Sequence, residues 1–175
     1  MLTKPSIVVL GLLCKNPINA YEVIKKIDVM NMKWWFPIGD STIYVTIKNL
    51  EKKKYVTGKI EKAGNMPEKK IYTITEEGRQ VFLNTLRNII CSFDYDTVWF
   101  SIAEIFINSF TKEEVCSMLK NRGMILDQYI HAMEAQVQDM EKQQRDMVYI
   151  CSVKRMKEIV KAEKESCSML IKNFE

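Results

Sequence analysis

The sequence is poor in the residues on which most catalytic and metal sites depend. It has a single histidine, His131, and no pattern of Cys or Asp at metal-ligand spacing accompanies it, so a structural or exposed role is expected for it. It also lacks a glycine-rich phosphate loop and a serine in a nucleophile elbow. Acidic pairs such as Glu76-Glu77 stand at predicted helix starts, where the helix dipole accounts for them. We therefore predict no enzyme, no metal site and no cofactor.

Long apolar runs and paired cysteines are missing as well. No run of about eighteen apolar residues occurs, so no membrane-spanning helix is expected. The short apolar stretch 7–13 lacks the cleavage site of a signal peptide, and we interpret it as a buried first helix. The five cysteines are odd in number, far apart and without a Cys-x-x-Cys pair. This favours reduced thiols in a cytoplasmic protein, with a redox-sensing cysteine as the alternative.

What the sequence does have is an uneven charge. Residues 1–90 hold 15 Lys or Arg and 8 Asp or Glu, a net charge of +7. Residues 91–175 hold 11 and 14, a net charge of −3. A basic front part favours contact with a polyanion, and ordinary solvated lysines are the alternative.

Residues 40–54 carry the strongest binding signal. Asp40 or Ser41 can cap a helix start there, and apolar residues follow at the spacing of one buried face: Ile43, Ile47 and Leu50. The opposite face holds Ser41, Thr42, Val45, Asn49 and Lys52, with Lys48 beside them and Tyr44 on the border. A short helix with such a face suits the major groove of DNA. An ordinary amphipathic helix with a solvated side is the alternative.

Two helices are predicted before this segment. The first covers 5–14, and the second runs from about 20 to 30 after a capping box of Asn19 with Glu22. The loop 31–39 then holds three large rings, and at least two of them should pack into the core or an interface: Trp34, Trp35 and Phe36.

Two strands and another helix are predicted after it. Residues 55–61 and 69–74 read as strands joined by a turn at 62–68, and a helix follows from Thr75 to about Ile90. The hairpin carries four lysines on its tip and flanks: Lys59, Lys62, Lys69 and Lys70. Helix, helix, helix, hairpin, helix is the order of a winged helix-turn-helix domain.

Short motifs in this order resemble those of PadR-type transcriptional regulators over nearly the whole chain. Each motif is weak alone, but together they are specific: Leu10-Gly11-Leu12-Leu13, Ala20-Tyr21-Glu22-Val23-Ile24, Thr42-Ile43-Tyr44, Leu50-Glu51, Pro67, Lys70-Ile71-Tyr72 and Thr75-Glu76-Glu77-Gly78. The chain departs from the family at Ala20, where Gly is usual, and at Lys54-Tyr55, where a Gly-Leu pair is usual. It also lacks the basic residue that is common near Met66 and Glu68 of the wing.

The resemblance implies a mainly α protein with a small β-hairpin wing. Residues 1–91 would form a winged helix-turn-helix DNA-binding domain, and 92–175 a helical domain for dimerisation and for sensing a ligand. The expected DNA contacts are Ser41, Thr42, Tyr44, Val45, Lys48, Asn49, Lys52, Lys62, Lys69 and Lys70. The resemblance further implies a homodimeric repressor on a palindromic operator of double-stranded DNA, released by a small molecule or another signal. A winged-helix module that docks proteins without binding specific DNA is the alternative.

The rear part is predicted to be helical throughout. Asp94 or Asp96 can cap a helix to Ser109 that is apolar nearly all round and must therefore be buried. Three aromatic residues lie in this helix or at its start: Tyr95, Trp99 and Phe100. Core packing is expected for them, and contact with a ligand is the alternative.

A long helical pair should follow this helix. Thr111 and Glu114 form another capping box, and residues 124–175 contain no Gly or Pro. Apolar residues repeat every seven as in a coiled-coil seam: Leu119, Leu126, Met133, Met140 and Met147. A bend between 143 and 149 would make the two helices antiparallel.

Overall fold

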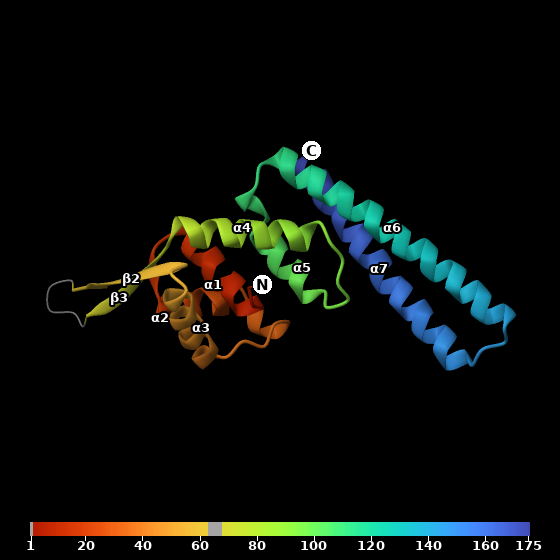
Figure 1. Ribbon diagram of the computed structural model, residues 1–175, viewed down its shortest axis with the longest axis horizontal. Coiled ribbons are helices and arrows are strands. Elements are labelled where there is room, and N and C mark those ends of the chain that lie inside the picture. The colour runs from red at the N-terminus through yellow and green to blue at the C-terminus, as the bar shows by residue number, and fades with distance from the viewer. Residues whose placement is uncertain (1, 63–67) are drawn as a thin grey trace. The chain divides into compact units, whose positions relative to one another are not determined.

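The computed structural model describes residues 2–62 and 68–175, and its elements follow the predicted order (Figure 1). The helices are α1 Lys4–Lys15, α2 Ala20–Val29, α3 Asp40–Lys52, α4 Glu76–Ile90, α5 Val98–Ile105, α6 Lys112–Lys142 and α7 Met147–Phe174. The strands are β1 Ile18–Asn19, β2 Val56–Glu61 and β3 Lys69–Ile74, and two 3-10 turns are η1 Met32–Trp34 and η2 Ile107–Ser109. The predicted class, mainly α with a small β wing and long C-terminal helices, is confirmed.

The described residues divide into two compact units. The first runs to Leu86 and also includes Asp96–Phe106, and the second comprises Arg87–Tyr95 and Ile107–Glu175. The segment that holds α5 thus groups with the front of the chain, although it lies beyond residue 91. The functional division into 1–91 and 92–175 stays a prediction.

The core of the first unit forms around α1. Thr3 caps this helix by accepting a hydrogen bond from the Ser6 backbone N–H, and every residue from 7 to 13 is buried. Gly11 is required there, because an added Cβ would lie 2.5 Å from the ring of Phe106. The missing side chain therefore lets the end of α5 pack directly against the backbone of α1.

The second helix begins as predicted. The Glu22 backbone N–H donates to the Asn19 side chain at 2.9 Å, and the Asn19 backbone N–H donates to the Glu22 carboxylate at 3.3 Å. This is the reciprocal capping box. It fixes the chain entry to α2 next to β1.

The aromatic loop differs from the prediction. Phe36 is buried, but Trp34 is 89% exposed and Trp35 is 37% exposed, so only one of the three rings enters the core. The 3-10 turn η1 directs Met32 inward, and Trp34 and Trp35 therefore lie on the outer side. The expectation of two buried rings is wrong for the core of this chain.

The wing belongs to a three-stranded antiparallel sheet in the order β1-β3-β2. The predicted hairpin is confirmed, with β2 and β3 paired from Val56↔Ile74 to Glu61↔Lys69. The short β1 was not predicted, and it pairs Ile18 with Tyr72. Residues 63–67 lie outside the described residues, and with them most of the predicted turn 62–68, the family motif at Pro67 and the departure at Met66.

The backbone conformation of Lys54, which stands where the family usually has Gly, is left-handed. Its φ of 62° is in the left-handed region, which glycine adopts without strain and other residues adopt at a cost. This explains why a glycine is usual at this position in the family that the chain resembles. The Thr75 hydroxyl, between β3 and α4, donates to the Lys54 carbonyl at 2.8 Å and so holds the segment between α3 and β2.

The start of α5 differs from the prediction. The helix begins only at Val98, its N-cap residue Thr97 makes no side-chain cap, and the helix ends at Ile105 before the separate turn η2. The carboxylate of Asp96 instead pairs with the ammonium of Lys4 in α1. One of the two residues predicted to cap the helix, Asp96, is thus held by a tertiary ion pair.

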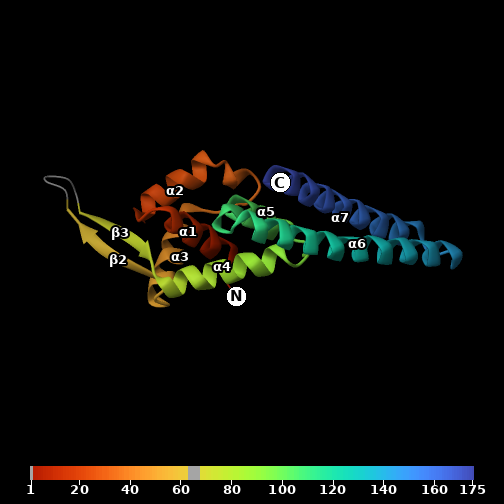
Figure 2. The same ribbon diagram turned by 90° about the horizontal axis from the view of Figure 1, so that it is seen from above.

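The second unit contains an antiparallel pair of long helices, and Figures 1 and 2 both show α6 and α7 side by side. Thr111 and Glu114 form the predicted capping box. The bend also lies where predicted, with Gln144 at a φ of 50° and the Asp146 carboxylate accepting from the Val148 N–H at 2.8 Å.

The predicted seam is buried over most of its length. The buried members are Leu119, Leu126 and Met133, together with Ile130 and Val137. Met140 is half-buried, and Met147 is 67% exposed because it stands at the first position of α7, where the helical pair ends. Its assignment to the seam is wrong.

Two further observations concern membranes and metals. Among residues 2–62 and 68–175, no helix combines the length and the apolar character that a bilayer crossing would need. In the same ranges, no three His, Cys, Asp or Glu side chains come together as metal ligands could. The side chain of His131 is 79% exposed.

Candidate nucleic-acid interface

The helix α3 divides into a buried and an exposed face. Ile43, Ile47 and Leu50 are at most 2% exposed, as their spacing predicted, and Thr46 is buried beside them. The seven candidate residues of this helix are all exposed: Ser41, Thr42, Tyr44, Val45, Lys48, Asn49 and Lys52. They are hydrogen-bonding or basic side chains except for Val45, so the face can donate and accept hydrogen bonds and neutralise negative charge.

The start of α3 is held differently from the prediction. Its N-cap is Gly39, and no side-chain cap is formed there. The Asp40 carboxylate lies 2.8 Å from the Lys33 ammonium, which also lies 2.8 Å from the carboxylate of Asp28. Hydrogen bonds to Asp28 and then Asp40 raise the pKa of Lys33 above its ordinary value. Lys33 thus joins the end of α2 to the start of α3.

The predicted wing lysines lie on or beside β2 and β3. Lys62, Lys69 and Lys70 are all exposed. Lys70 is paired with the carboxylate of Glu51 in α3 at 2.8 Å. The structure therefore brings this lysine to α3 itself.

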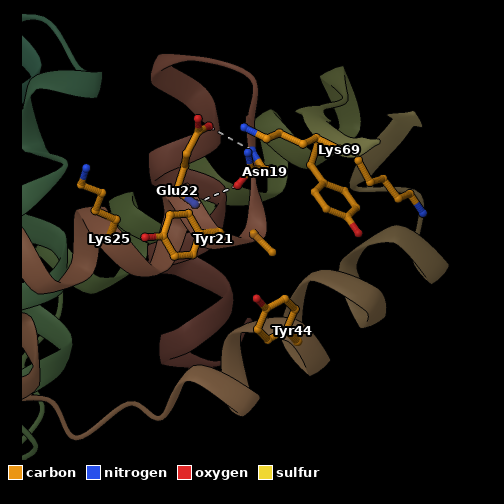
Figure 3. Close-up of a pocket in the computed structure, with 9 residues that line it drawn as sticks. Asn19, Tyr21, Glu22, Lys25, Tyr44 and Lys69 are labelled. Carbon is orange, nitrogen blue, oxygen red and sulfur yellow. Dashed lines mark hydrogen bonds between the residues drawn. The ribbon is translucent and has the colours of Figure 1, made fainter. Parts of the chain in front are cut away.

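An open depression of about 600 Å³ lies between α2, α3 and β3 (Figure 3). It is lined by Asn19, Ala20, Tyr21, Glu22, Lys25, Tyr44, Lys69, Lys70 and Tyr72. Figure 3 shows Tyr44 facing it from α3, opposite Tyr21 and Lys25 of α2. The Glu22 carboxylate is engaged by the Asn19 N–H in the capping box.

Sequence reasoning did not select Tyr21 or Lys25. The signal that could have found them is their four-residue spacing, which places both on one side of α2. Both are exposed and line the same depression as Tyr44. Phenol hydroxyls and ammonium groups arranged in this way can donate hydrogen bonds to anionic oxygens.

The three aromatic residues of the rear part do not form one group. Phe100 is buried in the first unit, which matches the expectation of core packing. Trp99 is half-buried, with the Lys4 ammonium 4.9 Å from its ring centroid. Tyr95 belongs to the second unit and packs against Phe93 at 5.0 Å between ring centroids.

Three helices, a two-stranded wing and a following helix define a winged helix-turn-helix protein. Residues 9–84, from within α1 into α4, match the model of the "Transcriptional regulator PadR-like family". Over this segment the chain matches the PadR-like family, and the resemblance recognised in the sequence is confirmed there. No curated protein matches the chain.

Several solved structures of PadR-like regulators are similar to the chain at low identity. Bacillus subtilis PadR in complex with operator DNA covers 100% of this chain and 99% of its own, with 19% identity and a TM-score of 0.48. Bacillus subtilis PadR in complex with p-coumaric acid covers 98% and 99%, with 17% identity and a TM-score of 0.44. The PadR-like regulator BC1756 from Bacillus cereus covers 97% of each chain, with 20% identity and a TM-score of 0.43.

Proposed function

We propose that this chain is a sequence-specific DNA-binding regulator that inserts α3 into the major groove and lays its wing along the backbone. The observation that carries the proposal is the exposed face of α3, on which hydroxyl, amide and ammonium groups stand opposite a fully buried apolar seam. A helix of this kind presents donors and acceptors to base edges, while its apolar side remains fixed in the core.

The proposed contacts divide by chemistry. Asn49 and Lys48 can reach base edges, Ser41 and Thr42 can bond to bases or phosphates, and Val45 offers an apolar surface to a thymine methyl group. Lys52, Lys62 and Lys69 would neutralise phosphates, which releases counterions and makes the affinity depend on salt.

The depression between α2, α3 and β3 is the proposed seat of one backbone phosphate. Tyr44 would donate to it from α3, and Tyr21 and Lys25 would approach from α2. This adds two residues to the contacts expected from the sequence. A phosphate held between two helices of the helix-turn-helix would fix the depth at which α3 enters the groove.

A homodimer is the proposed working form. One winged helix makes a small interface, and two copies related by a two-fold axis would read two half-sites of a palindromic operator. Exposed apolar side chains on α6 and α7 support a contact through the helical pair: Met124, Met147, Val148, Tyr149 and Met169. The proposed action is repression, relieved when a small molecule or another signal favours a spacing of the two winged helices that does not match the operator.

One observation favours the second candidate, a protein-docking module. Trp34 is 89% exposed and Val29 is 73% exposed, in and just before η1. A docking surface built on these residues would be apolar, whereas the face of α3 and the wing are polar and basic. The two candidates therefore predict different responses to substitutions in α3.

Selection from random duplexes followed by a salt series tests the proposal. The wild-type protein should enrich an inverted repeat, and Lys48→Ala should lower its affinity and its preference over random duplex. Lys62→Ala should reduce the salt slope by about 1 and keep the preference. Lys172→Ala, an exposed lysine of α7, is the matched control and should change neither. If the wild-type protein enriches no sequence, the proposal is wrong.

A further inference from the structure

The ion pair between Glu51 and Lys70 joins the last turn of α3 to the strand β3. The Lys70 ammonium lies 2.8 Å from each oxygen of the Glu51 carboxylate. It also lies 5.3 Å from the ring centroid of Tyr72, two residues along the strand. The lysine is therefore directed toward the recognition helix, although it stands on the wing.

Gly58 of β2 makes room for this arrangement. An added Cβ at this position would lie 2.2 Å from Cε of Lys70, 2.8 Å from Oε1 of Glu51 and 3.0 Å from the ring of Tyr72. Gly58 is paired with Tyr72 across the hairpin, so the two residues project to the same face of the sheet. The stem of Lys70 fills the space that a side chain at 58 would occupy.

We infer that Glu51 and Lys70 form a strut that sets the angle between the wing and the recognition helix. Lys70 is then a positioning residue, and the phosphate contacts of the wing fall to Lys62 and Lys69. This inference rests on the proposed function, in which α3 and the wing bind the same duplex. If Lys70 left Glu51 to bind a phosphate, an uncompensated carboxylate would face the DNA backbone, and like charges repel.

The strut acts on geometry more than on stability. Ion pairs between side chains as exposed as these contribute little to the free energy of unfolding. Loss of the strut should therefore leave the melting temperature nearly unchanged. It should lower specific affinity, because the wing and α3 must both be in register with the groove.

A charge swap separates a strut from a phosphate contact. With the duplex selected by the wild-type protein, Glu51→Lys and Lys70→Glu should each lower the ratio of specific to random-duplex affinity by about tenfold, because each change sets two like charges against each other where α3 meets β3. The double variant carrying both changes should return to within about threefold of wild type, with an unchanged salt slope. The control is Lys69→Glu, which Glu51→Lys should not rescue.

Other outcomes would contradict either the strut or the proposed function, and they can be told apart. If Lys70 binds a phosphate, Lys70→Glu lowers the salt slope and the swap stays as weak as that single variant, which overturns the strut. If the wild-type protein prefers no duplex, it is the proposed function that fails. Gly58→Ala is an independent variant that leaves both charges in place. It should lower the same ratio, and an unchanged ratio for Gly58→Ala in a folded protein would also contradict the strut.

Discussion

Arg122 of α6 lies 2.7 Å from the carboxylate of Glu163 in α7, with its side chain only 1% exposed. Its guanidinium also donates to the carbonyl oxygens of Ile89, at 3.3 Å, and of Ser92. A buried cation therefore satisfies carbonyl groups at and after the end of α4, where a helix leaves its acceptors unpaired. Within the second unit, one side chain joins the helical pair to the segment that leads into it.

Removing this arginine should strongly destabilise the protein. Arg122→Met is expected to lower the free energy of unfolding by about 3–5 kcal/mol, because it leaves the carboxylate of Glu163 without its buried cation and removes the hydrogen bond to the carbonyl of Ser92. The control Lys161→Met breaks an exposed pair with Glu158 and should cost less than about 1 kcal/mol. Urea unfolding followed by circular dichroism measures both values, and equal losses would contradict the role given to Arg122.

The left-handed residue at the end of α3 predicts a stabilising substitution. Lys54→Gly should raise the free energy of unfolding by about 0.5–1 kcal/mol, because Lys54 has a φ of 62° and glycine adopts it without strain. Lys53→Gly is the matched control, since Lys53 has a φ of −80° and gains nothing from glycine. Thermal melts should therefore shift upward for the first variant and downward for the second. A lower melting temperature for Lys54→Gly would refute the strain at this position.

Local signals in the sequence predicted most of the fold. The capping boxes at Asn19 and Thr111 depend on residues three positions apart, and both formed. The carboxylates of Asp40 and Asp96, two of the candidate helix caps, each pair with a lysine of another segment, Lys33 or Lys4. A partner brought in by tertiary packing is invisible to a local rule.

Local signals and tertiary packing also made different contributions to the candidate interface. Periodicity alone separated the buried and exposed faces of α3, since each face depends only on the helical repeat. The depression that adds Tyr21, and the contact of Lys70 with Glu51, depend on how β3 lies against the helices. The strand β1 was missed for a similar reason, because a two-residue strand is defined only by its distant partner.

Neighbouring positions of α3 should separate stability from binding. Ile47→Ala should lower the free energy of unfolding by about 2–5 kcal/mol, because Ile47 is 1% exposed in the core. Val45→Ala should change stability by no more than about 0.5 kcal/mol, since Val45 is 59% exposed, but should weaken binding to the selected duplex. Unfolding curves and fluorescence anisotropy measure the two effects. Unaltered binding by Val45→Ala would remove this residue from the proposed contacts.

The thiols should react in an order set by burial. Cys151 is exposed, Cys167 is buried, and burial raises the pKa of Cys14 and Cys91 above the ordinary 9.0. At pH 8 the thiolate fraction of Cys14 and Cys91 is smaller than that of a thiol with the ordinary pKa. Both should therefore react slowly, and their reaction should accelerate as the pH rises past 9. Labelling with a thiol reagent and mass spectrometry should show Cys151 first. Cys151→Ser should abolish that fast phase, and a Cys14 that reacts equally fast would contradict the burial found here.

The measurement that bears most directly on the DNA-binding role is a competition experiment with the full chain and the DNA upstream of its own gene. The proposed regulator should bind that duplex in preference to random duplex of equal length, as a dimer at micromolar concentration, and Lys48→Ala should lower this preference. A protein that remains monomeric and binds both duplexes equally would contradict the role assigned to α3.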